Sequence, residues 1–188
     1  MRDIKSPLSI VSGIMILISV FYPWWTAKVI ADPSGQVYYL HAYPYVLSVP
    51  SDFPQAWEKA IIRTPYIAQI GLEIALIVVI VSSFVASFLQ EKIGKRLLLF
   101  TSIFFLLYLA GFYGSLYYAC TIRIARGIGV AVKVQGTTII TMGGTIIDKF
   151  NPSYYLAIAA GILYLISYFV YGKISLNLNR ETKENEWE

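Results

Sequence analysis

The 188-residue sequence predicts an all-α membrane protein, in which a bundle of four transmembrane helices carries a small extracellular β-rich cap. Three observations support this class. First, 57% of the residues are hydrophobic and only 14% are charged, whereas soluble domains average about 25% charged residues. Second, four apolar segments each approach the ~20 residues that a helix needs to cross a bilayer. Third, the two longer connections are rich in β-branched residues and glycine, which favours strands and turns.

The four expected transmembrane spans cover approximately residues 7–25, 65–89, 96–122 and 152–172. Three of them begin with a capping residue followed by proline: Ser6-Pro7, Thr64-Pro65 and Asn151-Pro152. Such a side chain can accept a backbone N–H at the helix start, where proline loses nothing because its nitrogen needs no partner. Trp24 and Trp25 end the first span and are expected in the aromatic belt at the membrane surface. Residues 1–188 therefore form one integral membrane domain in this interpretation.

Basic residues near the spans predict the orientation. One side of the bundle would carry three clusters, at the N-terminus, between the second and third spans, and in the tail 173–188: Arg2 and Lys5; Lys92, Lys95 and Arg96; Lys173, Arg180 and Lys183. Lys and Arg are retained on the cytoplasmic side, so both termini are expected in the cytoplasm. The other side has a comparable number of basic residues, but they are spread over two longer loops. The expected location is the plasma membrane of a prokaryote, as a multi-pass protein.

The first outer loop, residues 26–64, contains a predicted β-hairpin and an amphipathic helix. In "AKVIA-DPSG-QVYYL", two β-prone runs flank a Pro/Gly turn. The following residues Tyr39, His41, Tyr43 and Tyr45 alternate, which would place them on one face of a strand. The stretch "SDFPQAWEKAIIR" then spaces Phe53, Trp57 and Ile61 at helical intervals, as expected for a helix on the membrane surface.

The second outer loop, residues 123–151, predicts two or three further strands. It is rich in Val, Ile and Thr, and Gln135-Gly136 and Gly143-Gly144 are the expected turns. Neither loop alone can bury a core. We therefore expect residues 29–46 and 128–147 to form one sheet over the ends of the helices, with Val132 facing inward.

The order helix, β-rich loop, helix, helix, shorter β-rich loop, helix resembles the claudin-type tetraspan topology. Trp24-Trp25 fall where those proteins carry tryptophan in the first outer segment. The resemblance covers architecture only. The paired cysteines of that outer segment and the Gly-Leu-Trp signature are absent from this sequence, so no barrier or pore function is carried over.

The sequence contains no catalytic signature and no pattern typical of a metal or cofactor site. Cys120 is the only cysteine and His41 the only histidine, which excludes a disulfide within the chain and a haem held by two of its histidines. No base can be assigned to activate Cys120, and "GIGVAVKV" lacks the third glycine of a dinucleotide site. Nucleic acid binding requires a basic face, and the sequence shows none. We therefore expect a non-enzymatic protein without cofactors.

Glu73, in "QIGLEIALIVVIVSSF", is the one charged residue inside an apolar span. It lies nine residues after Thr64, which is ~13 Å below the start of the helix at 1.5 Å per residue. An intramembrane charge costs ~2.5 kcal/mol or more, so Glu73 is expected to face the bundle beside Gln69, one turn away. Its further expected neighbours from the third span and its end are Tyr113, Tyr117 and Arg123. Three interpretations stay open: a structural carboxyl that clamps two spans, a proton, ion or ligand site, and a lipid-facing residue without a role.

The leading expectation is a structural, accessory or interaction subunit that binds other membrane or envelope proteins through its outer loops. The candidate interaction surface comprises Tyr39, His41, Tyr43, Tyr45 and Trp57, since aromatic residues are enriched in protein interfaces. Small-residue stripes in the spans also permit a homo-oligomer. The alternative is a transporter, channel or ion-pathway subunit that uses Glu73. An intramembrane or lipid-acting enzyme is the third possibility.

Overall fold

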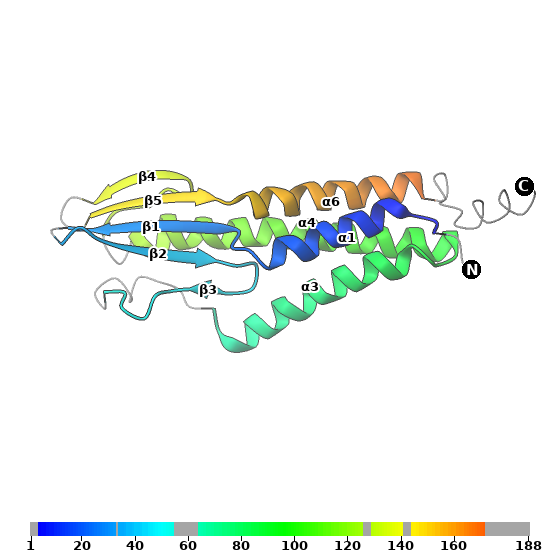
Figure 1. Ribbon diagram of the computed structural model, residues 1–188, viewed down its shortest axis with the longest axis horizontal. Coiled ribbons are helices and arrows are strands. Elements are labelled where there is room, and N and C mark those ends of the chain that lie inside the picture. Colours follow the sequence, from blue (N-terminus) through cyan, green and yellow to red (C-terminus); the bar gives the residue numbers. More distant parts are fainter. Residues whose placement is uncertain (1–3, 33, 55–63, 126–128, 141–143, 172–188) are drawn as a thin grey trace, which may run out of the picture.

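The computed structural model describes residues 4–32, 34–54, 64–125, 129–140 and 144–171, and it places a β-sheet at one end of a group of helices (Figure 1). The helices are α1 (Pro7–Val20), α3 (Tyr66–Ala86), α4 (Glu91–Tyr117), its π-helical continuation η1 (Tyr118–Arg123) and α6 (Pro152–Val170). The strands are β1 (Trp25–Ala31), β2 (Gln36–Ala42), β3 (Leu47–Ser48), β4 (Gly136–Ile140) and β5 (Gly144–Phe150).

The expected all-α class is wrong, because the chain has a mixed α+β fold. The five strands form one antiparallel sheet in the order β3-β2-β1-β5-β4. The expectation that both connections share one sheet is confirmed, and this sheet has its own buried core, which an all-α class does not describe. The chain is 59% helical and 19% strand, so the sheet belongs to the fold class together with the helices.

Among the described residues, three helices are long and apolar enough to cross a membrane: α3, α4 with η1, and α6. The expected first span, residues 7–25, is wrong at its C-terminal end. Helix α1 has 14 residues, or ~21 Å at 1.5 Å per residue, which is short of the ~30 Å hydrocarbon core. After Val20 the chain turns at Pro23 and enters β1 at Trp25. The four-span bundle is thus replaced by three helices of spanning length and one shorter apolar helix.

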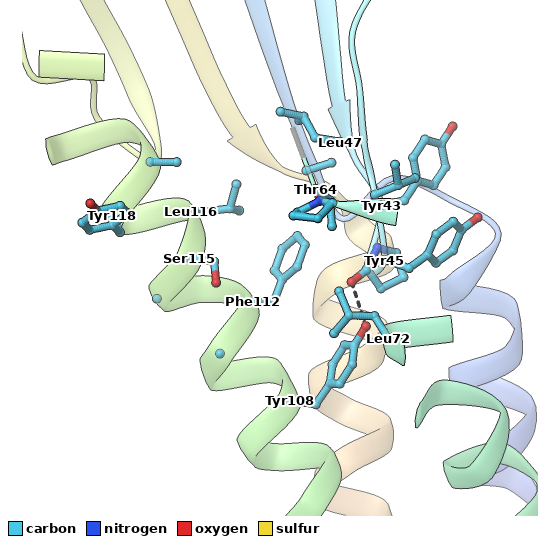
Figure 2. Close-up of a pocket in the computed structure, with 17 residues that line it drawn as sticks. Tyr43, Tyr45, Leu47, Thr64, Leu72, Tyr108, Phe112, Ser115, Leu116 and Tyr118 are labelled. Atoms are coloured by element: carbon cyan, nitrogen blue, oxygen red, sulfur yellow. Dashed lines mark hydrogen bonds between the residues drawn. The ribbon is translucent and has the colours of Figure 1, made fainter. Parts of the chain in front are cut away.

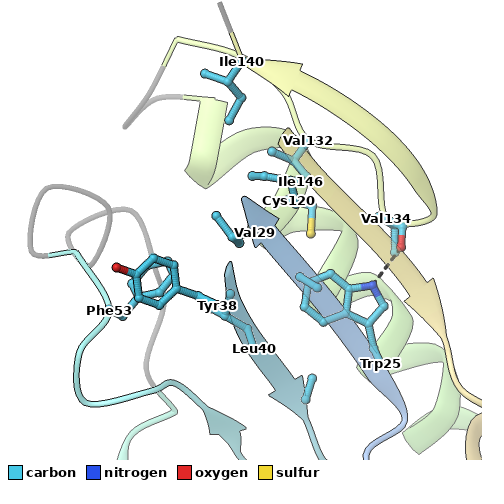
Figure 3. Close-up of a cluster of buried hydrophobic side chains, with 12 residues drawn as sticks. Trp25, Val29, Tyr38, Leu40, Phe53, Cys120, Val132, Val134, Ile140 and Ile146 are labelled. Atoms are coloured by element: carbon cyan, nitrogen blue, oxygen red, sulfur yellow. Dashed lines mark hydrogen bonds between the residues drawn. The ribbon is translucent and has the colours of Figure 1, made fainter. Parts of the chain in front are cut away.

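The tryptophans expected in an aromatic belt are buried. Trp24 has no exposed surface and packs between helices, where its Nε1 donates to the Ser19 carbonyl at 3.0 Å. Trp25 lies in the core of the sheet, and its Nε1 donates to the Val134 carbonyl at 2.8 Å (Figure 3). Each indole N–H has a partner, which is the usual condition for burying tryptophan.

The predicted caps are also not formed. Proline stands at the start of α1 and α6 as expected, but neither Ser6 nor Asn151 makes a side-chain capping bond. Asn151 instead donates from Nδ2 to the Pro23 carbonyl at 2.9 Å and to Thr26 Oγ1 at 2.8 Å. Its side chain therefore ties the start of α6 to the entrance of β1.

The sheet joins the two connections through β1, which pairs with β2 on one side and with β5 on the other. The predicted β1–β2 hairpin is confirmed, and Gly35 at its turn has a positive φ of 66°. Gly144, at the start of β5, also has a positive φ, and a Cβ there would collide with the Ile30 carbonyl of β1. This glycine permits the close approach of the two strands that links the halves of the sheet.

One face of the sheet packs against the end of the long α4–η1 helix. Glu91–Arg123 has 33 residues, or ~50 Å at 1.5 Å per residue, so it exceeds the ~30 Å hydrocarbon core and reaches beneath the strands. Cys120 of η1 and Val132, both almost fully buried, meet the inward side chains of the strands there (Figure 3). The expectation that Val132 faces inward is confirmed.

Candidate functional site

The opposite, exposed face of the sheet carries several large apolar side chains among its polar ones. Strand register places Tyr39, Lys28 and Ile147 side by side across β2, β1 and β5. The next row toward the tip consists of Val37, Ile30, Thr145 and Ile139. Ile139 is 75% exposed. An antiparallel sheet with one solvated face normally alternates apolar and polar residues, so this face breaks the rule.

Sequence reasoning missed the isoleucines of this face. The available signal is two pairs of neighbouring isoleucines, Ile139-Ile140 in β4 and Ile146-Ile147 in β5. Successive residues of a strand point to opposite faces, so each pair places one isoleucine in the core and one outside. Ile140 and Ile146 are buried, and Ile139 and Ile147 are exposed.

The expected aromatic surface is only partly continuous. Tyr39 and His41 lie on the exposed face of β2, with their rings stacked at 6.3 Å, and His41 Nδ1 is 3.1 Å from Thr26 Oγ1. Strand β2 ends at Ala42. Tyr43 and Tyr45 follow in a turn, where their rings stack on each other at 6.1 Å. Trp57 and the predicted amphipathic helix around it lie outside the described residues.

Glu73 is half-buried on α3, and its carboxylate accepts a hydrogen bond of 3.0 Å from the Gln69 amide. The expected pairing of these two residues on one helix face is therefore present. Burial raises the pKa of Tyr45, and the negative charge of Glu73 raises it further, which places Tyr45 in the electrostatic field of the carboxylate. Tyr45 and Glu73 are 28 positions apart, so no local pattern indicates this electrostatic effect.

The other expected neighbours of Glu73 lie elsewhere. Tyr113 is stacked on Phe150 at the end of β5, with ring centroids 5.9 Å apart. Tyr117 and Arg123 are exposed on α4 and η1. Helix α3 diverges from α4 toward the sheet (Figure 1), and this divergence separates residues that hydropathy places at one depth.

The divergence leaves an open cavity of about 800 Å³ below the sheet (Figure 2). Its walls are the β2–β3 connection, the start of α3 and the second half of α4, represented by Tyr45, Leu72, Tyr108 and Phe112. The Tyr108 hydroxyl donates to the Pro44 carbonyl at 2.7 Å and holds the connection against α4. The buried side chains of α3 all lie in its second half, from Leu76 onward, so the helix is not packed where it borders the cavity.

Asp148 is a second unusual carboxyl, on the inward face of β5. It is 2% exposed, and neither carboxylate oxygen has a hydrogen-bond partner among the described residues. Burial raises its pKa from 3.8 to about 7. Within the described part of the chain, no group of three or more His, Cys, Asp or Glu side chains is placed to hold a metal.

Comparisons with known proteins assign no family to this architecture. No protein-family model matches the chain, and a search of curated proteins finds no match. The functional argument therefore depends on the geometry of the sheet face, the Glu73 group and the cavity.

Proposed function

We propose that this is a non-enzymatic membrane protein that acts as an accessory or interaction subunit and binds a partner protein through the exposed face of its sheet. The observation that supports this proposal is a set of exposed apolar side chains in two neighbouring rows of that face: Val37 and Ile139 in one row, and Ile147 in the other. Exposed apolar patches of this kind mark protein interfaces. The aromatic ring of Tyr39 beside them suits an interface anchor.

The charges on the face indicate the chemistry of the partner. Lys28 and Lys149 lie among the apolar residues of β1 and β5, and the described strand residues of this face include no carboxylate. A second copy docked through the same patch would bring lysines toward lysines, which is unfavourable. The proposed partner is therefore a different membrane or envelope protein, with an apolar surface bordered by acidic residues.

Basic residues at the end opposite the sheet support the proposed orientation in the membrane. Lys5, Lys92, Lys95 and Arg96 lie near the ends of the helices that point away from the sheet. Retention of basic residues in the cytoplasm supports cytoplasmic termini and a sheet outside the plasma membrane of a prokaryote. In a Cys120→Ser background, a cysteine at Lys92 should react with an impermeant maleimide only after the cells are opened. Labelling of intact cells at that position contradicts the orientation.

Site-specific photocrosslinking tests the docking face. Benzoylphenylalanine at Tyr39 should form one discrete adduct in native membranes, and Tyr66, an exposed tyrosine at the start of α3, provides the control position. Lys28→Glu should abolish the Tyr39 adduct because it reverses the charge that faces the acidic border. Lys133→Glu, an exposed lysine outside the strands, should leave it unchanged. No adduct at Tyr39, or one that is insensitive to Lys28→Glu, refutes the proposed partner.

Glu73 supports a second candidate function, a transporter, channel or ion-pathway subunit. The favouring observation is that a half-buried carboxylate sits about 10 Å from the start of a spanning helix, beside an open cavity. The Gln69 hydrogen bond equally suits a structural role. Glu73→Gln distinguishes the ion-pathway role from the structural role, since glutamine keeps the shape of the side chain and removes its charge. Loss of ion flux in reconstituted vesicles with unchanged thermal stability supports the pathway, and unchanged flux supports the structural role.

A further inference from the structure

The side of α4 that borders the cavity contains two glycines that have no close neighbours, unlike glycines at helix contacts elsewhere in the protein. Gly111 and Gly114 both line the cavity, and a Cβ added to either would meet nothing within 4 Å. Gly161 also lies in a helix of spanning length, but a Cβ added there would be 3.2 Å from Leu106. At these two positions, α4 is therefore not covered by side chains of the described residues.

The position of the cavity relates it to the bilayer. Counted from Arg96 at the basic end of α4, the ~20 residues that cross the hydrocarbon core end near Ser115. The cavity spans this level, with Tyr108 and Phe112 below it and Tyr118 above. The neighbouring Tyr113 and Tyr117 are exposed on α4, and Ile67 is 85% exposed on α3. Ile67 is two residues from Pro65, which lines the cavity, so an exposed apolar surface of α3 begins beside it.

We propose that this cavity is a binding site for a hydrocarbon chain of a membrane lipid, which enters sideways between α3 and α4. Its volume lies within the range of about 300–1,000 Å³ typical of ligand cavities. Its lining is mostly apolar, as a hydrocarbon chain requires. The hydroxyls of Thr64 and Ser115 and the turn at Tyr43 supply a polar rim toward the sheet, where the polar part of the lipid emerges.

This site is separate from the proposed docking face. The cavity lies below the sheet, between helices, whereas the docking face is the outward side of the strands. A chain bound here fills the space that α3 leaves by diverging from α4, so it supports the connection between β2 and β3. The inference holds or fails independently of the partner proposed above.

Photolabelling in vesicles tests the site. The full chain is reconstituted into phosphatidylcholine vesicles that contain a phosphatidylcholine with a diazirine in one acyl chain. We expect labelling concentrated on the α4 peptide that contains residues 108–119. In Gly111→Leu and Gly114→Leu the new side chain occupies the cavity, and labelling of that peptide should fall about tenfold.

Gly71→Leu is the matched control. Gly71 is also a glycine of a spanning helix with nothing within 4 Å of an added Cβ, but it does not line the cavity. Leucine is a better helix former than glycine, so all three variants should stay folded, as thermal unfolding in detergent will verify. Wild-type protein without preferential labelling of residues 108–119 overturns the inference. Equal labelling of the wild type and the two filled variants, or equal loss in Gly71→Leu, overturns it too.

Discussion

The two ends of the helical region differ in how completely they are packed. At the end away from the sheet, Ser9 Oγ and Ser87 Oγ are 2.6 Å apart, and the Tyr171 hydroxyl donates to the Ala86 carbonyl at 2.6 Å. Gly13 there lies directly against Ser83, so that a Cβ would collide with it. At the sheet end, α3 and α4 separate and leave the cavity.

The difference shows that small residues serve two opposite purposes in this protein. Gly13 and Gly94 let helices and side chains approach closely, as glycines do in membrane interfaces. Gly111 and Gly114 face open space. The tightly packed end holds the helices together. The imperfectly packed end contains the cavity and Asp148, whose carboxylate has no hydrogen-bond partner among the described residues, and it carries the candidate functions. Such departures from good packing are expected at functional sites.

The largest expected effect is from Val132→Asp, which adds a second buried carboxylate to the sheet end. Val132 is 2% exposed, and its N–H donates to the Cys120 carbonyl at 3.1 Å. An unpaired buried charge costs several kcal/mol, so we expect loss of more than about 4 kcal/mol or no folded protein. Ala131→Asp, at the exposed neighbour, is the control. Thermal unfolding measures both, and wild-type stability in Val132→Asp would show that the sheet core tolerates charge.

The next effect concerns the pH dependence that Asp148 confers. Burial raises the pKa of Asp148 from its ordinary value of 3.8 to about 7, so the contribution of this group to folding stability is most favourable below pH 4 and is lost as pH rises to about 7. The difference of about three units corresponds to up to about 4 kcal/mol at 1.36 kcal/mol per unit. Asp148→Asn should remove this dependence and unfold at a higher temperature than wild type at pH 8. If the melting temperatures of the two proteins change with pH in the same way, Asp148 does not confer the pH dependence, and its carboxylate must have a partner.

Gly13→Leu should then distinguish the packed end from the open one. The new side chain must displace Ser83, and overpacking of this kind costs about 1–3 kcal/mol. Gly71→Leu makes the same chemical change on α3 over open space, and we expect no loss of stability. Thermal unfolding of the two variants in one detergent gives the comparison. Equal melting temperatures would mean that the contact of α1 with α3 is loose.

The smallest effect is expected for single hydroxyls. Tyr171→Phe removes the donor to the carbonyls of Ala86 and Leu89, at 2.6 and 3.0 Å, and should cost about 1 kcal/mol. Tyr155→Phe, at an exposed tyrosine, should have no effect.

Tyr108→Phe loses the hydrogen bond to the Pro44 carbonyl, but that bond borders the cavity. The substitution should therefore change hydrogen exchange near Pro44 more than the melting temperature. A large fall in melting temperature for Tyr108→Phe would contradict the view of the cavity as a weakly packed region.

The helices were largely predictable because their signal is local. Uninterrupted apolar runs from Tyr66 and from Pro152 indicate α3 and α6 without reference to any other part of the chain. The β1–β2 hairpin was predictable for the same reason, since its turn residues stand between its strands. The end of α1 was not, because Phe21 to Trp25 are apolar whether they continue a helix or enter a strand.

The candidate sites depended on pairings between distant segments. Gln69 and Glu73 are four residues apart on one helix, so their hydrogen bond could be expected. The exposed apolar face required the register of β1 with β5, which joins residues more than 100 positions apart. The cavity required the divergence of α3 from α4.

The sequence by itself determined where apolar helices form, where the hairpin turns and which residue types are available for chemistry, because helical hydropathy and turn formation act over a few neighbouring residues. The single sheet shared by both connections was also expected, but only the tertiary structure decided that β1 pairs with β5, that Trp24 and Trp25 are buried, and that Gly111 and Gly114 line a cavity. The burial of a side chain depends on what packs against it from elsewhere in the chain, and a local pattern does not contain that information.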